Sequence, residues 1–431
     1  MDYTGVLILV LSFVVLLSIG VPIAFAIGIS TMFTMLASID AIPAWTTLAQ
    51  RMITGLDNFA LLAIPFFILA GQLMNRGGIA TRLIDFAKVL VGMLPGGLAY
   101  VNILAAMLFG AISGSAGAAA SAIGGFMTPL MTKDGYDRPF SAAVNITSAT
   151  TGLIIPPSNT LIVYSLASGG VSIGALFLAG YLPGLLVGLF LMLVAGYFSY
   201  RRKYPTGDRV SFRVAMLKLW DAIPSMLLLV VVMGGIIAGI FTATEASAIA
   251  VLYAFLLALT YREISLKDVP GILKSTIWTT SIIMILIGTS IGMSWIMSFE
   301  QIPQIVSETL LSISDSKVII LLLINLILLF VGIFMDMTPA VLIFTPIFLP
   351  IVIDLGIDPI HFGIIMVLNL CIGLCTPPVG SVLFIGCSVA KISIMQVIKP
   401  LLPMFVAMII ALIIITYVPE ISMFLPRLFG F

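Results

Sequence analysis

Residues 153–165 read LIIPPSNTLIVYS, and residues 374–386 read LCTPPVGSVLFIG. Each segment places a pair of prolines inside an apolar run that is long enough to cross a membrane. A proline removes one backbone hydrogen bond and crowds the preceding turn, so we expect a helix to break at both places. The two breaks are 221 residues apart (377 − 156 = 221). This recurrence indicates that the chain consists of two related halves.

The composition is that of a polytopic helical membrane protein. Of the 431 residues, 61% are hydrophobic and 9% are charged, whereas soluble domains carry about 25% charged residues. The net charge of +1 gives no indication of nucleic acid as a partner. We interpret Cys371, Cys375 and Cys387 as buried thiols without a disulfide framework. The N-terminal run lacks a basic start and a small-residue cleavage site, so we expect it to be a retained span.

The apolar segments form two sets. They lie near 4–20, 22–38, 57–76, 97–131, 140–168 and 173–200 in the first set, and near 222–241, 244–261, 275–298, 317–350, 362–388 and 392–418 in the second. Residues 201–221 between the sets are the most basic polar stretch, which the positive-inside rule places in the cytoplasm. We therefore expect both chain termini on the periplasmic side.

Comparison of the halves indicates an inverted repeat. At the offset of 221, the identical pairs include Pro129 and Pro350, Gly135 and Gly356, Asp137 and Asp358, Gly152 and Gly373, and Ser172 and Ser393. The link after the third span is basic in the first half (Arg76, Arg82, Lys88) and acidic in the second (Glu300, Glu308, Asp315). Equivalent loops are therefore expected on opposite sides of the membrane, as in secondary transporters whose site lies at the repeat interface. The alternative is that any two sets of membrane segments look alike.

The segment 97–131 is too long for one span. Its 35 residues (131 − 97 + 1 = 35) would make a helix of about 50 Å, against a bilayer core of about 30 Å. Its centre, GAISGSAGAAASAIGG (110–125), is rich in small residues. We expect a re-entrant hairpin that turns at 113–115, and a second one over 317–350 that turns at 335–340. The alternative for the proline pairs is a simple packing kink.

Polar side chains accompany both hairpin turns and both breaks. They are Ser113, Ser115, Ser158 and Asn159 in the first half, and Asp336, Thr338, Thr376 and Ser381 in the second. Irregular backbone at membrane depth is tolerated only where it is buried in protein or lines a wet cavity. Such breaks free carbonyl oxygens for a small cation, and half-helix N-termini attract anionic groups. The sequence therefore predicts two related cradles for an alkali cation and a substrate. Asp336 has the alternative role of capping the helix after it.

At these residues the chain resembles a known family. PFFILAGQLM (65–74), GAISGSAGAAASAIGGFMTPLM (110–131), IPPSNTLIVYSLASG (155–169) and ALFLAGYLPGLL (175–186) resemble the large membrane subunit of tripartite ATP-independent periplasmic (TRAP) transporters. The resemblance implies an all-α elevator-type transporter that imports organic anions with sodium across the bacterial inner membrane. It also implies a periplasmic substrate-binding protein and a small four-span membrane subunit as partners, besides membrane lipids. Among its members we expect a sialic-acid transporter, and C4-dicarboxylate transporters are the main alternative.

The resemblance also assigns residues and segments. The sodium-binding residues would be Ser113, Ser115, Pro156, Ser158 and Asn159, with Gly332, Asp336, Thr338, Thr376 and Gly380. Independently of the resemblance, we expect Ser115, Asn159, Asp336 and Ser381 to bind the substrate. The scaffold would be 1–76 and 222–298, the interfacial arms 77–96 and 299–316, the linker 201–221, and the moving parts 97–200 and 317–419. No organic cofactor and no metal other than sodium is expected.

Two other classes of function are alternatives to a transporter. An intramembrane enzyme is suggested by GTSIG (288–292), which matches G-x-S-x-G. That motif needs a strand–turn–helix context and a histidine partner, whereas the only histidine, His361, is predicted in an outer loop. Helix packing is the better interpretation. A channel is the second alternative, but an inverted pair argues for alternating access. For Asp137, we expect local ion pairs within the turn 133–138.

Overall fold

The structure, a computed structural model, describes residues 4–207, 211–314 and 316–431. These residues form helices joined by short loops, and the described part of the chain contains no β-strand beyond one isolated bridge between Pro95 and Thr206. Within it, eight helices are long and apolar enough to cross a membrane. Asp315 and parts of the segments predicted over 1–76 and 201–221 lie outside the described residues.

The first half runs from α1 to α10. Its helices are α1 (Thr4–Ser18), α2 (Ile23–Ser38), α3 (Ala41–Leu56), η1 (Phe59–Leu62), α4 (Ala63–Arg76), α5 (Ile79–Val91), α6 (Gly97–Ser113), α7 (Ala116–Lys133), α8 (Arg138–Thr151), α9 (Asn159–Ala167) and α10 (Ile173–Arg201). The α6–α7 pair is the first predicted hairpin. The segment between α8 and α9 is the first predicted break.

The second half repeats this order. Its helices are α11 (Phe212–Ile237), α12 (Ala243–Thr260), α13 (Val269–Phe299), α14 (Ile302–Ile313), α15 (Lys317–Phe334), α16 (Met337–Asp354), α17 (Pro359–Gly373), α18 (Ser381–Ala390), α19 (Ile394–Tyr417) and α20 (Glu420–Leu428). The helices α16, α17 and α19 begin 221 residues after α7, α8 and α10 (337 − 116, 359 − 138 and 394 − 173). The predicted repeat, with two hairpins and two interrupted helices, is confirmed.

The same close helix contact occurs in both hairpins. A Cβ atom placed on Gly110 of α6 would lie 2.8 Å from the Cα atom of Gly152, which follows α8. In the second half, a Cβ atom on Gly332 of α15 would lie 3.0 Å from the Cα atom of Gly373 in α17. Only glycine allows such an approach of two backbones. Each hairpin is therefore held against the broken helix of its own half near the break.

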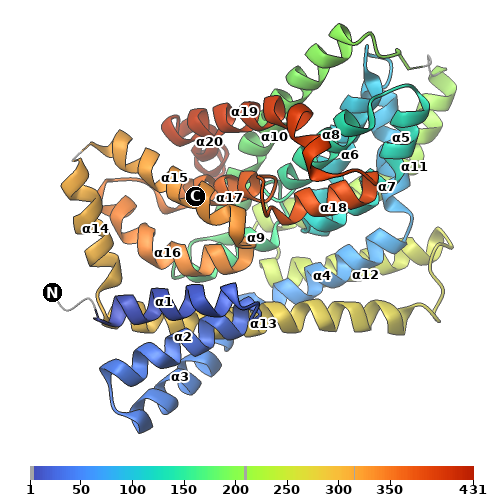
Figure 1. The fold of residues 1–431 in the computed structure, drawn as a ribbon. Helices are drawn as coiled ribbons and strands as arrows, with labels where there is room; N and C mark the ends of the chain where they lie inside the picture. Colours follow the sequence, from blue (N-terminus) through green and yellow to red (C-terminus); the bar gives the residue numbers. More distant parts are fainter. Residues whose placement is uncertain (1–3, 208–210, 315) are drawn as a thin grey trace.

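The two halves interlock through their hairpins and broken helices. Helix α18 packs on α7, and its counterpart α9 packs on α16. Helices α2, α3 and α4 pack against the long helix α13, while α1 packs on α2 and α12 on α4. This group lies on the lower side of Figure 1, with the hairpins and broken helices above it. The hairpin turns lie where these two groups of helices meet.

Several elements differ from the sequence predictions. Helix α11 begins at Phe212, so the second half of the polar linker predicted over 201–221 is helical. The sequence did not predict α3 and α20 as helices. His361 lies inside α17 and is 2% exposed, so its predicted place in an outer loop is wrong. The reason is that Asp358 caps α17 by accepting from Ile360 N at 2.8 Å, which starts the helix before the histidine.

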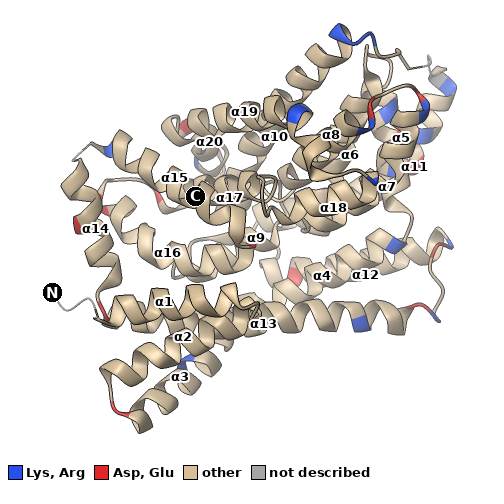
Figure 2. Ribbon diagram, viewed as in Figure 1, with Lys and Arg blue, Asp and Glu red and all other residues tan. Residues whose placement is uncertain are grey.

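The charged side chains gather at the ends of the helices, and most Lys and Arg residues lie at the end with α5, α11 and the α7–α8 turn (Figure 2).

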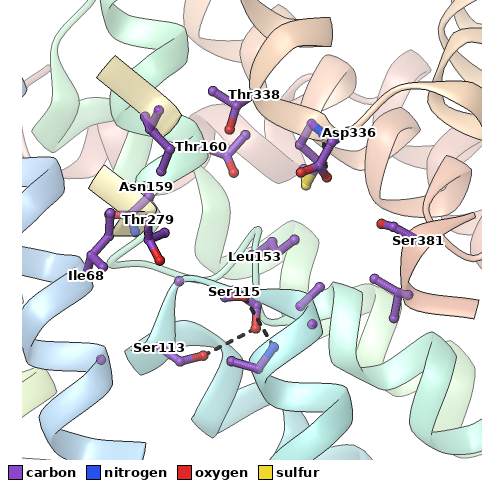
Figure 3. A pocket seen from close by; sticks show the side chains of 18 of the residues that line it. Ile68, Ser113, Ser115, Leu153, Asn159, Thr160, Thr279, Asp336, Thr338 and Ser381 are labelled. Carbon is purple, nitrogen blue, oxygen red and sulfur yellow. Dashed lines mark hydrogen bonds between the residues drawn. The ribbon is translucent and has the colours of Figure 1, made fainter. Parts of the chain in front are cut away.

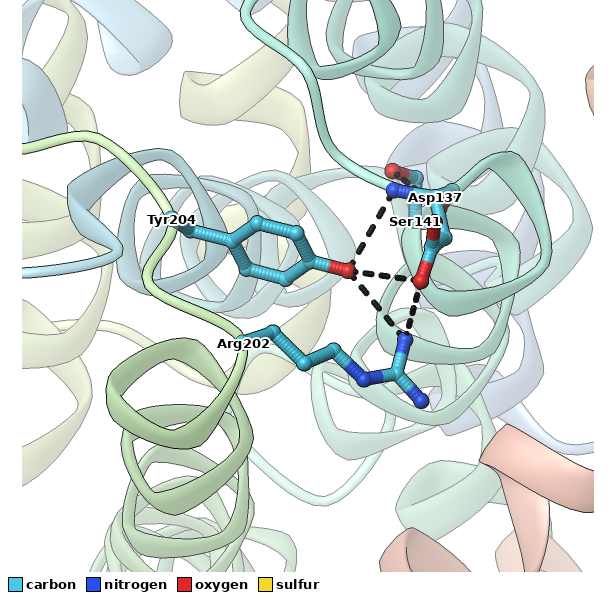
Figure 4. Close-up of polar contacts among 4 residues, drawn as sticks. All are labelled: Asp137, Ser141, Arg202 and Tyr204. Atoms are coloured by element: carbon cyan, nitrogen blue, oxygen red, sulfur yellow. Dashed lines mark hydrogen bonds and ion pairs between the residues drawn. The ribbon is translucent and has the colours of Figure 1, made fainter.

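At this basic end, Asp137 accepts from Arg202 Nη1 at 2.5 Å and from Tyr204 OH at 3.0 Å (Figure 4). The expected ion pairs within the turn are therefore replaced by one to the end of α10. Tyr136 stacks on Tyr204 with 4.2 Å between ring centroids, and burial raises the pKa of Tyr136 to about 12. Both tyrosines of this contact are therefore uncharged at neutral pH.

Candidate functional site

A cavity of about 460 Å³ lies between α4 and α13 on one side and the hairpin turns on the other. Figure 3 shows the polar side chains that reach it from several separate elements. The polar residues that line it are Gln72, Asn75, Ser113, Ser115, Asn159, Thr160, Thr279, Asp336, Thr338 and Ser381. Six of the residues predicted from the sequence are thus brought together in one place, although they come from both halves of the chain.

The N-terminal ends of α7, α9, α16 and α18 converge on this cavity. Their first residues, Ala116, Asn159, Met337 and Ser381, all line it. The N-terminus of a helix carries unpaired backbone N–H groups and a partial positive charge. No Lys, Arg or His lines the cavity among the described residues. The helix ends are therefore the source of partial positive charge at this cavity, which Asp336 also lines.

The turn of the first hairpin is built around Gly114. This residue has a φ of 60°, in the left-handed region, and a Cβ atom on it would lie 2.7 Å from Nδ2 of Asn159. The hydroxyl of Ser113 donates to the carbonyl oxygen of Ser115 at 3.4 Å, and Oγ of Ser115 accepts from Ala118 N at 3.2 Å. The Oδ1 atom of Asn159 is buried and has no partner. A buried acceptor without a donor is costly, so this oxygen is suited to a cation.

Asp336 forms the turn of the second hairpin. Its Oδ1 atom accepts from Met337 N at 3.0 Å, which caps α16. It forms no ion pair with any described residue, and it faces the cavity opposite the first turn (Figure 3). The capping alternative is thus present in the structure. One amide from the adjacent residue leaves most of the acceptor capacity of the carboxylate open.

Five predicted residues do not line the cavity. Ser158 donates to the carbonyl oxygen of Leu153 at 2.5 Å, and Thr376 donates to that of Ile372 at 2.8 Å. The other three, Pro156, Gly332 and Gly380, contribute backbone only. A hydroxyl that donates keeps its oxygen lone pairs. The oxygens of Ser158 and Thr376 therefore keep lone pairs for a small ion, and neither residue lines the cavity.

The sequence predictions missed the residues that line the cavity from α4 and α13. Gln72 and Asn75 belong to α4, and Thr279 belongs to α13. A signal was available in the sequence, because two amides three residues apart interrupt an apolar span. On a helix this spacing places both side chains on one face.

The G-x-S-x-G match at 288–292 lies inside α13. A Cβ atom on Gly292 would lie 2.4 Å from Cδ1 of Leu48, and one on Gly288 would lie 3.4 Å from Cδ1 of Leu56. Both leucines belong to α3. The glycines therefore let α3 pack against α13, as expected for helix packing, and no strand precedes the serine.

The fold is similar to that of a solved transporter. The crystal structure of the YdaH transporter from Alcanivorax borkumensis, described as having an unusual topology, matches with a TM-score of 0.67. The match covers 96% of this chain and 97% of that chain, at 13% sequence identity. At this identity the comparison shows the fold alone.

Sequence comparisons show the family. The chain is 57% identical to the uncharacterized protein YgiK of Salmonella typhimurium, over 99% of this chain and 98% of that protein. It is 41% identical to the C4-dicarboxylate TRAP transporter large permease protein DctM of Pseudomonas aeruginosa, over 94% of both chains. It is 39% identical to the sialic acid TRAP transporter large permease protein SiaM of Vibrio cholerae, over 96% of both chains. Residues 10–421 match the family model described as the DctM component of the tripartite ATP-independent periplasmic transporter. The chain therefore belongs to the family of large permease components of TRAP transporters.

Proposed function

We propose that this chain is the large membrane subunit of a sodium-coupled importer of organic anions in a bacterial inner membrane. One observation carries the proposal. Both hairpin turns meet at one cavity with the N-terminal ends of α9 and α18, the helices that follow the two breaks. In secondary transporters, interrupted helices of this kind bind the substrate with their positive ends and the coupling ion with their oxygens. The inverted repeat supports alternating access rather than an open channel, and family membership favours a transporter over an enzyme.

Sodium is proposed at two related places. The first would use the oxygens around Ser113, Ser115 and Asn159 with the break at Pro156–Ser158. The second would use Asp336 and Thr338 with backbone at Gly332 and at 376–380. The unpartnered Oδ1 atom of Asn159 and the unpaired carboxylate of Asp336 support these places. Sodium would be a coupling ion here, and we propose no organic cofactor.

The substrate would lie between Ser115, Asn159, Asp336 and Ser381. A carboxylate would approach the helix ends, together with bound sodium, because the lining provides no basic side chain. We favour a sialic acid, with a C4-dicarboxylate next. The charge balance supports this order, since a second carboxylate on the substrate would find Asp336 and no cationic side chain among the described lining residues.

The assembly and the motion belong to the same proposal. A periplasmic binding protein would deliver the substrate, a small four-span subunit would support the scaffold, and both termini would be periplasmic.

The parts 97–200 and 317–419 would move as an elevator against α1–α4 and α11–α13. Two ion pairs support a static arm α5: Lys218 Nζ lies 3.0 Å from Asp85 Oδ1, and Arg82 Nε lies 3.5 Å from Asp221 Oδ1. Both pairs bind α5 to α11.

The test is uptake by proteoliposomes that contain this chain and the small subunit, with the loaded binding protein outside. We expect uptake of N-acetylneuraminate to stop when external sodium is replaced by potassium at equal ionic strength. Unchanged uptake in potassium would refute sodium coupling. Uptake that dissipates any solute gradient in either direction, without the binding protein, would favour a channel.

A further inference from the structure

Two amide side chains face the cavity from the helix group that does not form the hairpins. Gln72 and Asn75 lie three residues apart on α4 and both line the cavity. Neither side chain makes a hydrogen bond to another described residue. We propose that these two amides recognise the hydroxyl groups of a polyhydroxylated monocarboxylate and thereby set the specificity of the permease itself. This inference rests on the proposed function.

The position of the two amides follows from Gly71. A Cβ atom on Gly71 would lie 2.9 Å from the carbonyl oxygen of Ser113 and 3.2 Å from its Cα atom. The turn of the first hairpin therefore rests directly on α4 at this glycine. Gln72 follows it immediately and Asn75 lies one turn further along, so both amides stand beside the hairpin turn, at the edge of the same cavity.

The chemistry of an amide suits a hydroxyl group. An amide side chain offers two N–H donors and a carbonyl acceptor, so it can both donate to and accept from a neutral hydroxyl. Gln72 is half-buried in an apolar part of α4, and a polar group there is kept at a cost unless it pairs or faces a wet cavity, whereas Asn75 is exposed in the last turn of the helix. An apolar pocket cannot discriminate strongly between molecules that differ in hydroxyl groups, whereas a site with open hydrogen-bonding groups can.

The two sides of the cavity thus divide the substrate between them. The helix starts at Ala116, Asn159, Met337 and Ser381 form the positive side, which suits the carboxylate. The amides of α4 form an uncharged polar side, which suits hydroxyls. Thr279 of α13 also lies here, but its hydroxyl already donates to the carbonyl oxygen of Ser275 at 3.1 Å. A volume of about 460 Å³ is within the usual range for a small-molecule site.

A matched pair of acids tests this division. Gluconate and hexanoate have the same carbon chain and the same charge, but only gluconate carries hydroxyl groups along the chain. We would measure their affinities, with those of N-acetylneuraminate and succinate, for the full chain in complex with its small subunit in lipid nanodiscs. Saturating sodium is present and the binding protein is omitted, so that its own selectivity does not enter.

The variants are Gln72→Leu and Asn75→Leu, with the milder Gln72→Ala and Asn75→Ala in case a leucine perturbs folding. Gln50→Leu is the matched control, because Gln50 lies on α3 outside the cavity and is exposed. Each loss of a neutral hydrogen bond is expected to weaken gluconate and N-acetylneuraminate binding about threefold to tenfold. Hexanoate binding, the thermal stabilisation by sodium, and the control variant should be unchanged.

Three outcomes bear on the inference. Gluconate binding that is weakened in the α4 variants, with hexanoate binding unchanged, supports it. The inference is overturned if the α4 variants bind gluconate as tightly as the parent, or if the parent prefers hexanoate or succinate. In both cases sodium-dependent anion binding, and with it the proposed function, stands. A parent that binds none of the acids in sodium overturns the proposed function and this inference together.

Discussion

The thiol of Cys371 donates to the carbonyl oxygen of Thr150 over 3.3 Å, and these two residues are 221 positions apart. This separation is the offset that relates the two halves, so each residue occupies in its half the position of the other. Equivalent residues that touch lie at the axis that relates the repeats. Cys375 extends the contact, with 3.5 Å between its Sγ atom and Oγ1 of Thr150. The broken helices α8 and α17 thus meet at the axis, in a fully buried core.

Asp336→Asn separates an ion role from a capping role. The asparagine keeps an oxygen that can cap α16 at Met337 but removes the charge. We expect assembled protein with a higher sodium requirement and little net uptake. Each charge moved through 100 mV is worth about 2.3 kcal/mol, so the loss of one bound sodium should reduce accumulation severalfold and by up to about fiftyfold at that potential. If the variant takes up substrate as fast as the parent at limiting sodium, Asp336 has only the capping role.

Asn159→Ala removes the unpartnered oxygen at the first hairpin turn. We expect weaker sodium-dependent uptake without loss of assembly, because Oδ1 of Asn159 makes no bond that holds the fold. The measurement is the sodium concentration at half-maximal uptake, which should rise. Asn58→Ala is the control, since Asn58 caps η1 by accepting from Ala60 N at 2.9 Å and lies outside the cavity. An unchanged sodium requirement would remove Asn159 from the site.

Labelling of single cysteines tests the inverted arrangement. Cysteines at 134 and 206 should react with an impermeant maleimide only from the cytoplasm, and those at 312 and 357 only from the periplasm. The native Cys371, Cys375 and Cys387 are buried, so the parent protein should give little background. If positions 134 and 357 react from the same side, the halves are not inverted in the membrane.

Gly71→Val tests the contact of the first hairpin turn with α4. A Cβ atom there would lie 2.9 Å from the carbonyl oxygen of Ser113, so the added side chain would displace the turn. Such overpacking typically costs about 1–3 kcal/mol. We expect lower uptake and a lower melting temperature, with Gly125→Val as the control because its Cβ would meet nothing within 4 Å. Normal uptake by Gly71→Val would mean that the turn does not rest on α4.

The repeat, the hairpins and the breaks were predictable because they leave strong local signals. Proline pairs, glycine-rich centres and segment length each act over a few residues, and the offset of 221 needed no gap. Residues that such signals could not place depend on contacts between distant segments. Gln72 and Asn75 are an example, because their role follows from the hairpin turn that Gly71 admits. His361 is another, since its Nδ1 atom lies 2.7 Å from Oγ of Ser422 in α20, a helix that the hydropathy pattern did not indicate.

Entry of sodium together with the substrate is the most direct test of the central claim. Proteoliposomes with this chain and the small subunit would receive radioactive sodium and N-acetylneuraminate-loaded binding protein on the outside, at a fixed membrane potential. We predict that the loaded binding protein accelerates sodium entry in constant proportion to substrate entry, and that Asp336→Asn lowers this proportion. Substrate accumulation without any accompanying sodium entry would contradict the account.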